Sequence, residues 1–261
     1  MYRFLLRPRW LTFHALVVVL LVVMVNLGFW QLRRLDERRD RNAKVEERSA
    51  LAAAPVDEVL SLDGDVAGEA DTEWRTVTAA GRYDAEHQVL IRNRSYEGAP
   101  GYHVVTPLVT NLGTLLVNRG WIPYGDDAGP VVPEPPAGEI AVTGRLRPSQ
   151  NRGRIGPRDQ ADGTLDQLAR VDIARIQAQT PGRLYPLYAE LVGADPAPGE
   201  LPRLIPLPEL GDGPHLSYAG QWFLFGACVV VGWVVVVRRA ARQGGQFRRE
   251  RPPVLDDLPV S

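Results

Sequence analysis

The stretch Leu11–Trp30 reads LTFHALVVVLLVVMVNLGFW and contains no Asp, Glu, Lys or Arg. As a helix with a rise of ~1.5 Å per residue, it would be about 30 Å long, the thickness of the hydrocarbon core of a bilayer. The alternative is a cleaved signal peptide, which needs a shorter apolar run and a cleavage site of small residues. This run is longer and ends in Asn26-Leu-Gly-Phe-Trp-Gln31, which offers no such site. We therefore predict an uncleaved transmembrane helix over residues 11–31.

A second apolar block of spanning length runs from Tyr218 to Val237. The valines at 229–231 and 234–237 would also suit a buried strand, but no turn residue interrupts the block. Arg238 and Arg239 end it, as interfacial anchors do at the end of a transmembrane helix. Small residues such as Gly226 let a neighbouring helix approach closely. We predict a second transmembrane helix over 218–237, packed against the first.

Charge is divided unevenly although the net charge is only -1. The tails, residues 1–10 and 238–261, are rich in arginine, which leaves the stretch 31–217 acidic and excludes nucleic acid as an expected partner. Two spans place both termini on one side. The positive-inside rule favours cytoplasmic termini in a cell membrane, with residues between the spans outside the cytoplasm. The rule is weak for a long loop that also carries basic residues at 33–44, so the opposite orientation stays open.

Between the spans the hydrophobic pattern changes twice. Residues 32–73 are predicted to form a charged helical stalk, since 31–50 contain neither proline nor glycine, and then a short helix and an acidic linker. From Trp74 apolar residues recur at every second position, which predicts a β-rich domain over 74–217. We expect six or seven mostly antiparallel strands, closed into a small barrel or strongly curled sheet. The expected elements are a hairpin of 76–83 with 87–95, a hairpin of 100–110 with 114–122, strands at 140–147 and 185–191, a short helix over 172–179, and loops at 130–136 and 151–163.

The sequence contains no strong catalytic motif, so we predict that the protein is not an enzyme. Glycine-rich phosphate loops, His-Glu-x-x-His and Gly-x-Ser-x-Gly are all missing, and the lone Cys228 excludes disulfides and cysteine-based metal sites. Of four dispersed histidines, His87 and His103 lie in expected strands and are interpreted as surface or hydrogen-bonded side chains. His14 lies within the first span, where an ionisable residue suggests function. It also lies close enough to the end of the span to reach the interface.

His215 stands where the β-rich domain meets the second span. A neutral imidazole there can ligate haem iron. Aromatic side chains surround this position in the sequence: Trp30 ends the first span, and Tyr218 and Trp222 begin the second. These residues alone also fit an aromatic belt at the membrane surface, which needs no cofactor.

Three motifs that follow one another along the chain bear on the choice between a haem ligand and an aromatic belt. They are Leu27-Gly-Phe-Trp-Gln-Leu-Arg-Arg34, Leu116-Val-Asn-Arg-Gly-Trp-Ile-Pro123 and His215-Leu-Ser-Tyr-Ala-Gly-Gln-Trp-Phe223. Together, between two spans, they resemble the surfeit locus protein 1 family of cytochrome c oxidase assembly factors, from about Leu11 to Val237. The chain departs from the family at Pro214, where an asparagine often precedes the histidine, and in having arginines near the first span where a lysine is expected.

The resemblance implies a respiratory complex IV assembly factor and haem chaperone that delivers haem a to subunit I of the oxidase, with haem a synthase as a second expected partner. In this reading His215 donates an axial nitrogen to the iron, and Trp30, Tyr218 and Trp222 flank the ring. Arg33 or Arg34 would pair with the propionates. The alternative is a cofactor-free membrane scaffold that stabilises an oxidase assembly intermediate.

The middle motif contributes Arg119 and Trp121. A period of two predicts that Val117, Arg119 and Trp121 share one face of a strand, with Gly120 leaving room for close backbone approach. Either Arg119 stacks on Trp121 to stabilise the strand end, or the two form an interaction surface.

Overall fold

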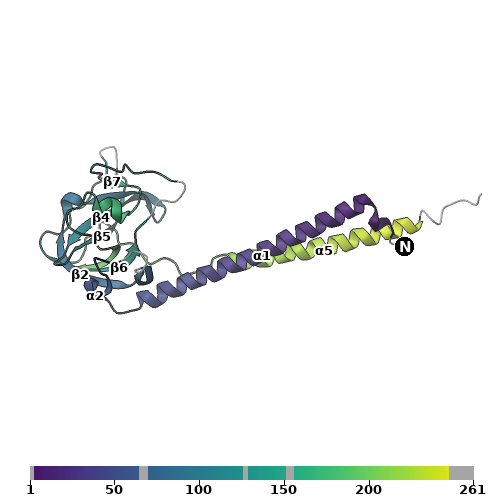
Figure 1. Cartoon of the computed structure of the whole chain (residues 1–261), viewed down its shortest axis with the longest axis horizontal. Helices are drawn as coiled ribbons and strands as arrows, with labels where there is room; N and C mark the ends of the chain where they lie inside the picture. The colour runs from purple at the N-terminus through teal and green to yellow at the C-terminus, as the bar shows by residue number, and fades with distance from the viewer. Residues whose placement is uncertain (1–2, 65–69, 126–128, 151–155, 247–261) are drawn as a thin grey trace, which may run out of the picture. The chain divides into compact units, whose positions relative to one another are not determined.

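A computed structural model describes residues 3–64, 70–125, 129–150 and 156–246 (Figure 1). It divides the chain into two compact units. One combines Met1–Asn42 with Leu210–Ser261 and contains most of the two long helices, whereas the other, Ala43–Glu209, contains the end of the first helix and the β-sheet. We call them the helix pair and the sheet domain.

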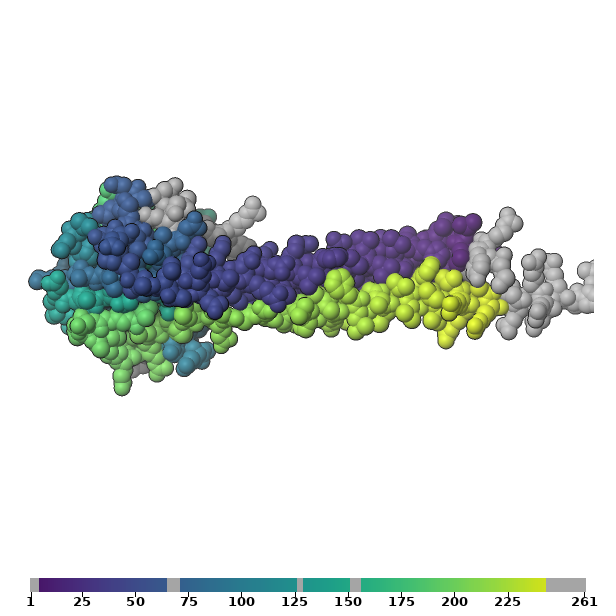
Figure 2. Space-filling view, turned by 90° about the horizontal axis from the view of Figure 1, so that it is seen from below, coloured from purple at the N-terminus to yellow at the C-terminus, as the bar shows by residue number. Residues whose placement is uncertain are grey.

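The helix pair is built from α1 (Pro8–Ser49), preceded by the 3-10 helix η1 (Arg3–Leu6), and α5 (His215–Gln246). Both are long and apolar enough to cross a membrane, and the predicted spans 11–31 and 218–237 lie inside them. They run antiparallel and side by side (Figures 1 and 2). Most of their apolar side chains, such as Val19 and Leu224, are exposed, as side chains that face lipid would be. As predicted for residues 31–50, the helix continues past the first apolar block, and α1 runs without a break to Ser49.

Small residues set how closely the two helices approach. A Cβ atom built at Gly28 would lie 2.7 Å from the ring of Phe223, so only glycine fits here without a shift of that ring. Phe223 in turn packs edge-on against Phe29, with ring centroids 5.6 Å apart. The contact joins the end of the first apolar segment to the start of the second.

Within its described residues, the sheet domain has six strands of eight or more residues and two short ones. The order is β1-β2-β6-β8-β5-β4-β3-β7, and β2 also pairs with β4, which closes a ring of β2, β6, β8, β5 and β4. All pairings are antiparallel except β1–β2, β3–β7 and β5–β8. The predicted closed or curled, mostly antiparallel sheet is therefore confirmed. The strands are β1 (Ala54–Pro55), β2 (Thr76–Tyr83), β3 (Val89–Tyr96), β4 (Ala99–Val109), β5 (Thr114–Pro123), β6 (Ile140–Pro148), β7 (Gln167–Leu168) and β8 (Leu187–Asp195).

One predicted hairpin is confirmed and the other is wrong. β4 and β5 pair through a tight connection in which Thr110 N–H donates to the Gly113 carbonyl (2.9 Å). β2 and β3 do not form a hairpin: β2 pairs with β6 and β4, and β3 pairs with β4 and β7. Their connection forms the 3-10 helix η3 (Ala85–His87), and Asp84 N–H donates to the Pro107 carbonyl of β4 (2.8 Å). The chain therefore leaves β2 toward β4 and does not fold back on β2.

Short helices and loops complete the domain. The predicted helix over 172–179 is confirmed as α4 (Ile173–Gln177), where the Asp172 side chain caps the N-terminus by accepting from Arg175 N–H (3.2 Å). Residues 130–136 form no helix or strand, as predicted. Of the loop predicted at 151–163, residues 151–155 lie outside the described residues, and 156–163 form no helix or strand. The other short elements are α2 (Val56–Val59) and η2 (Ala70–Thr72).

The core lies on both sides of β5, whose residues from Thr114 to Ile122 are all buried. One apolar cluster includes Leu108, Leu146 and Leu187, and another includes Ile91 of β3 and Ile176 of α4. Because both faces of β5 are covered, its polar residues Asn118 and Arg119 are buried as well. Their exposed fractions are 1% and 5%.

Candidate functional site

The first turns of α5 carry the predicted haem-binding residues of the third motif, His215, Tyr218 and Trp222. The helix begins at His215, so this residue lies within its first turn and not in a linker before it. His215, Tyr218 and Trp222 stand at i, i+3 and i+7, positions that lie on one face of a helix. His215 is half-buried, whereas Tyr218 is 47% exposed. The helix therefore presents an imidazole and two aromatic rings along one stripe.

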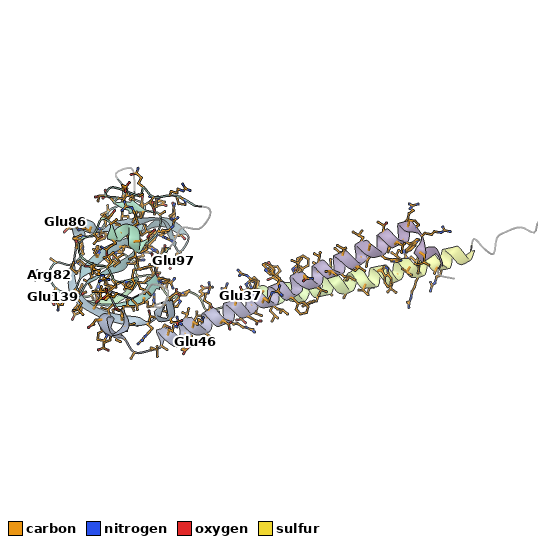
Figure 3. All side chains as sticks on the ribbon, in the orientation of Figure 1. Glu37, Glu46, Arg82, Glu86, Glu97 and Glu139 are labelled. Atoms are coloured by element: carbon orange, nitrogen blue, oxygen red, sulfur yellow. The ribbon has the colours of Figure 1, made fainter. Side chains whose placement is uncertain are left out.

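The haem-binding residues predicted on α1 also lie on one face of their helix. Trp30, Arg33 and Arg34 stand at i, i+3 and i+4, and Trp30 is 47% exposed. Arg34 pairs with Glu37 of its own helix (Nη1 to Oε2, 2.7 Å), which Figure 3 labels on the charged stretch of α1. Because both partners are exposed, this ion pair adds little stability and can open readily. Arg33 forms no hydrogen bond or ion pair within the described residues.

A hydrogen bond joins the two stripes. His215 Nδ1 lies 2.9 Å from Oε1 of Gln31, the neighbour of Trp30 on α1. An amide oxygen only accepts, so Nδ1 must carry the proton, and Nε2 of the neutral ring keeps its lone pair. Gln31 lies within the first motif, but its position in the sequence indicates no role for it. Its role depends on a contact between residues 184 positions apart.

The segment just before α5 is fixed to α1. Arg38 Nε and Asn42 Nδ2 both donate to the carbonyl of Gly211, and Arg39 forms an ion pair with Asp212 (2.6 Å). The hydrogen bond from Arg39 lowers the pKa of Asp212 below its ordinary value. Gly213 has a φ of +67°, the left-handed region, and so turns the chain into the helix. These contacts set where His215 begins α5.

The opposite end of the helix pair contains His14. The indole Nε1–H of Trp233 donates to His14 Nδ1 (2.9 Å), and the Trp10 and Phe13 rings lie beside the imidazole, with centroids 5.7 and 5.9 Å away. The bond joins α1 to α5. With Nδ1 used as an acceptor, the neutral ring carries its proton on Nε2 and has no lone pair left for a metal.

The remaining histidines lie in the sheet domain. His87 Nδ1 contacts Asp84 Oδ2 (2.6 Å), and His103 Nδ1 contacts Asn118 Nδ2 (3.2 Å). Burial, and then the charge of Arg94, lower the pKa of His103 to about 4, so this ring is neutral at neutral pH. Among the residues that the structure describes, no group of three or more His, Cys, Asp or Glu side chains could hold a metal ion.

Arg119 and Trp121 do not share a face of β5, contrary to the alternation expected from the sequence. Val105 of β4 pairs with Asn118 and Val104 pairs with Gly120, so Arg119 is the extra residue of a β-bulge. The extra residue shifts the alternation, and Trp121 lies on the Asn118 face. The Arg119 guanidinium lies 5.6 Å from the centroid of the Tyr83 ring, while Trp121 stacks on Tyr96 with centroids 5.5 Å apart. The expected Arg119–Trp121 stack is therefore wrong.

The bulge also buries both side chains. Arg119 and Trp121 are each 5% exposed. Gly120 has a φ of +131°, and a Cβ atom there would lie 2.2 Å from the carbonyl oxygen of Arg203, so the close approach predicted for this glycine is confirmed. Trp121 and Arg203 exchange two backbone hydrogen bonds of 2.8 Å, through which the chain after β8 covers the end of β5.

Comparison with known proteins identifies the family. The model of the SURF1 family matches residues 18–227. SURF1-like proteins of Mycobacterium tuberculosis and Mycobacterium bovis are 34% identical over 234 residues, covering 88% of this chain and 83% of each relative. A SURF1-like protein of Dictyostelium discoideum is 30% identical over 106 residues, 38% of each chain. The chain thus belongs to the SURF1 family, whose members generally act in the assembly of cytochrome c oxidase.

Proposed function

We propose that this protein is a haem a-binding chaperone that holds haem a at His215 and assists its insertion into subunit I of cytochrome c oxidase. Haem a is cargo in this proposal and not a permanent cofactor. Its long isoprenoid tail partitions into lipid, so a carrier at the membrane surface would keep the ring accessible while the tail stays in hydrocarbon. Haem a synthase would supply the cargo and the oxidase subunit would receive it.

The observation that carries the proposal is the bond from His215 Nδ1–H to the Gln31 oxygen. Metal-ligating histidines usually donate their second ring N–H to a carbonyl or carboxylate, which fixes the tautomer and makes the ligating nitrogen more basic. His215 has this arrangement, and its Nε2 forms no hydrogen bond within the described residues. The donor set therefore fits a haem iron that takes one protein nitrogen.

The neighbouring side chains fit the rest of the cargo. Trp30, Tyr218 and Trp222 offer aromatic surface on both helices for the ring. Arg33, which has no partner among the described residues, is available to a propionate, and Arg34 could exchange Glu37 for one through a charge-assisted bond. Tyr218 and Trp30 are 47% exposed, so the surface is open on one side. An open surface with one protein ligand suits a carrier that must release its cargo.

The same proposal includes the membrane topology. We place both termini in the cytoplasm of the cell and the sheet domain outside it, on the basis of the arginine-rich tails. Reporter fusions at the two termini should give the same cytoplasmic readout. Termini on opposite faces of the membrane would contradict the antiparallel pair that positions His215 beside Gln31.

The test is the absorption spectrum of the full-length protein, purified in detergent from cells that make haem a. We expect a Soret band in the wild-type protein that is largely lost in His215→Ala. The matched control is His14→Ala, because it also removes an imidazole that bonds across the helix pair. This variant should keep the band.

Two outcomes would overturn the proposal. Equal loss of the band in His14→Ala and His215→Ala would indicate that the helix pair, and not the imidazole, retains haem. A colourless wild-type protein that still restores oxidase assembly would favour the alternative function, a cofactor-free scaffold that stabilises an assembly intermediate.

A further inference from the structure

The sheet domain contains a small cavity that the proposed haem site does not use. Its volume is about 240 Å³. Pockets that hold drug-sized ligands are larger, with volumes of about 300–1,000 Å³. Strands β2, β5, β6 and β8 contribute side chains to it, and two irregular segments, Pro133–Pro136 and Pro196–Pro202, form its other walls. Apolar residues predominate in the lining, including Ile140 and Leu191.

A buried cation without a carboxylate partner lines this cavity. Arg119 is 5% exposed, and no ion pair with Asp or Glu forms at its guanidinium within the described residues. Its Nη1 donates to Gln88 Oε1 (3.1 Å) and to the Pro133 carbonyl (3.0 Å), and its Nη2 donates to the Glu134 carbonyl (3.2 Å). A guanidinium has five N–H groups, so these three bonds leave donor capacity. Desolvation lowers the pKa of Arg119, which reflects the cost of keeping this charge in an apolar site.

The ring of a second buried donor, Tyr83, lies beside the Arg119 guanidinium. The hydroxyl of Tyr83 is buried and forms no hydrogen bond within the described residues, and the Arg119 guanidinium lies 5.6 Å from the centroid of its ring. Burial raises the pKa of Tyr83 to about 12, so the hydroxyl keeps its proton and can donate it. An unsatisfied buried hydroxyl is costly, and each one in a native structure requires an explanation.

The cavity walls restrict what could satisfy these groups. Five of the lining residues are prolines, which have no backbone N–H: Pro133, Pro136, Pro196, Pro198 and Pro202. The charged side chains that the domain keeps in water, such as Arg82, Glu86 and Glu139, project from its surface and do not line the cavity (Figure 3). Glu134 also lines the cavity but meets Arg119 through its backbone carbonyl, so no carboxylate of the described residues pairs with the guanidinium and a ligand anion can do so.

We propose that this cavity is a binding site for a small monocarboxylate with a short apolar chain. The carboxylate accepts from Arg119 and from the Tyr83 hydroxyl, and the chain lies against the proline and leucine side chains. Carboxylates match the fork of a guanidinium, and the charge-assisted bonds that form are among the stronger ones in proteins. This site is independent of the haem-binding proposal, because all of its residues belong to the sheet domain.

The test uses a series of straight-chain carboxylates, acetate to hexanoate, on the full-length protein in detergent, with calorimetric titration and thermal unfolding as readouts. We expect saturable binding that strengthens about fourfold for each added methylene until the cavity is filled. Butyramide, the neutral amide of the same shape as butyrate, should bind at least about tenfold more weakly because it lacks the charge.

Two variants separate a binding role from a structural one. Replacing Arg119 could unfold the domain, because its guanidinium also holds the Pro133–Glu134 segment. Tyr83→Phe removes only a hydroxyl that has no partner, so the ligand-free protein should be as stable as the wild type or more so. Its affinity for butyrate should fall about tenfold. Tyr124→Phe, a control whose hydroxyl bonds Asn93 outside the cavity, should leave the butyrate affinity unchanged.

Three results would overturn the proposal. One is the absence of saturable binding across the whole carboxylate series. Another is equal binding of butyrate and butyramide, which would mean that the cavity is merely apolar. The third is an unchanged butyrate affinity in Tyr83→Phe. In each case Arg119 would be a structural cross-link between β5 and the Pro133–Glu134 segment.

Discussion

The two ends of the helix pair carry similar contacts with opposite chemistry. At one end Trp233 donates to Nδ1 of His14, and at the other end Nδ1 of His215 donates to Gln31, each over 2.9 Å. An imidazole that accepts at Nδ1 holds its proton on Nε2, whereas one that donates from Nδ1 keeps a lone pair at Nε2. The partner on the other helix therefore decides which of these two rings keeps a lone pair at Nε2, the nitrogen that the haem-binding proposal requires. Residue type and position in a span do not distinguish them.

The sheet domain offers a third case that resembles His14. His103 Nδ1 lies 3.2 Å from Nδ2 of Asn118, a nitrogen that only donates, so this ring also accepts at Nδ1. Of these three rings, only that of His215 combines a free lone pair with partial exposure and neighbouring aromatic side chains. Changing the partner of each ring tests whether this contrast determines function.

The largest effect is expected at Gln31. Gln31→Leu removes the acceptor of the His215 Nδ1 proton, and loss of such a supporting partner typically costs about 10- to 100-fold in metal affinity. Gln31→Glu keeps an acceptor oxygen and should retain haem at least as well as the wild type. The rate of haem transfer to apomyoglobin measures both. Asn26→Leu is the control, since among the described residues its amide bonds only to Val22 of the same helix (2.7 Å). Equal transfer rates in Gln31→Leu and Asn26→Leu would contradict the role assigned to Gln31.

A smaller effect is expected when acid protonates His103. Its pKa is about 4 in the folded protein and about 6.5 in the unfolded chain, so between these values the unfolded chain binds more protons. Above pH 6.5 the contribution of His103 to the free energy of unfolding should not change with pH. Below pH 6.5 the free energy of unfolding should fall as the pH drops toward 4. The difference between the two pKa values corresponds to at most about 3 kcal/mol of unfolding free energy. Because the ring is partly exposed, we expect a loss of stability of about 1–2 kcal/mol.

The measurement for His103 is the free energy of unfolding of the full-length protein in detergent, as a function of pH. His103→Gln supplies an oxygen that accepts from Asn118 but does not titrate. Its stability should therefore vary less between pH 6.5 and 4 than that of the wild type. The same pH dependence in both proteins would show that His103 does not contribute to it.

Much of the fold follows from local patterns in the sequence. The two apolar blocks, the uninterrupted 31–50 stretch and the Asn111–Gly113 connection each act within a few residues, and the helices and the hairpin predicted from them are confirmed. The hairpin of β2 and β3 failed because closure of the ring is not local. The pairing of β2 with β4 at Arg82–Val109 and Tyr83–Leu108 takes the place that β3 would occupy.

The burial of charged side chains also could not be predicted from the sequence. Alternation along 140–147 leaves Arg145 on the side opposite the apolar residues, yet it is only 7% exposed. Its guanidinium donates to the carbonyl of Ile205 (2.6 Å), in an irregular segment after β8 that no periodic pattern could place. The bulge at Arg119 is a similar case, because one extra residue reverses the faces of all positions that follow.

For the candidate site, sequence spacing alone groups Trp30 with Arg33 and Arg34, and His215 with Tyr218 and Trp222. Whether these groups hold haem stays a prediction. The sequence could not show that Gln31 joins them, since amide residues are common at the ends of spans. Nor could it show that His14 is an acceptor, because this depends on Trp233, 219 residues away.

The smallest effect is expected from the bond between His14 and Trp233. Hydrogen bonds between transmembrane helices contribute about 0.6 kcal/mol on average and up to about 1.7 kcal/mol. A double-mutant cycle of His14→Phe and Trp233→Phe isolates this energy, because each change keeps an aromatic ring and removes one partner. Unfolding in sodium dodecyl sulfate, followed by energy transfer between labels on the two helices, measures the coupling.

The cycle also sharpens the contrast between the two ends of the helix pair. If the His14 bond only holds helices together, the coupling should be positive while haem retention in both single variants stays at the wild-type level. Zero coupling would mean that the bond contributes nothing to association. A loss of haem in Trp233→Phe as large as in His215→Ala would mean that the two ends act together, and that the direction of the bond at His14 does not exclude it from the haem-binding role.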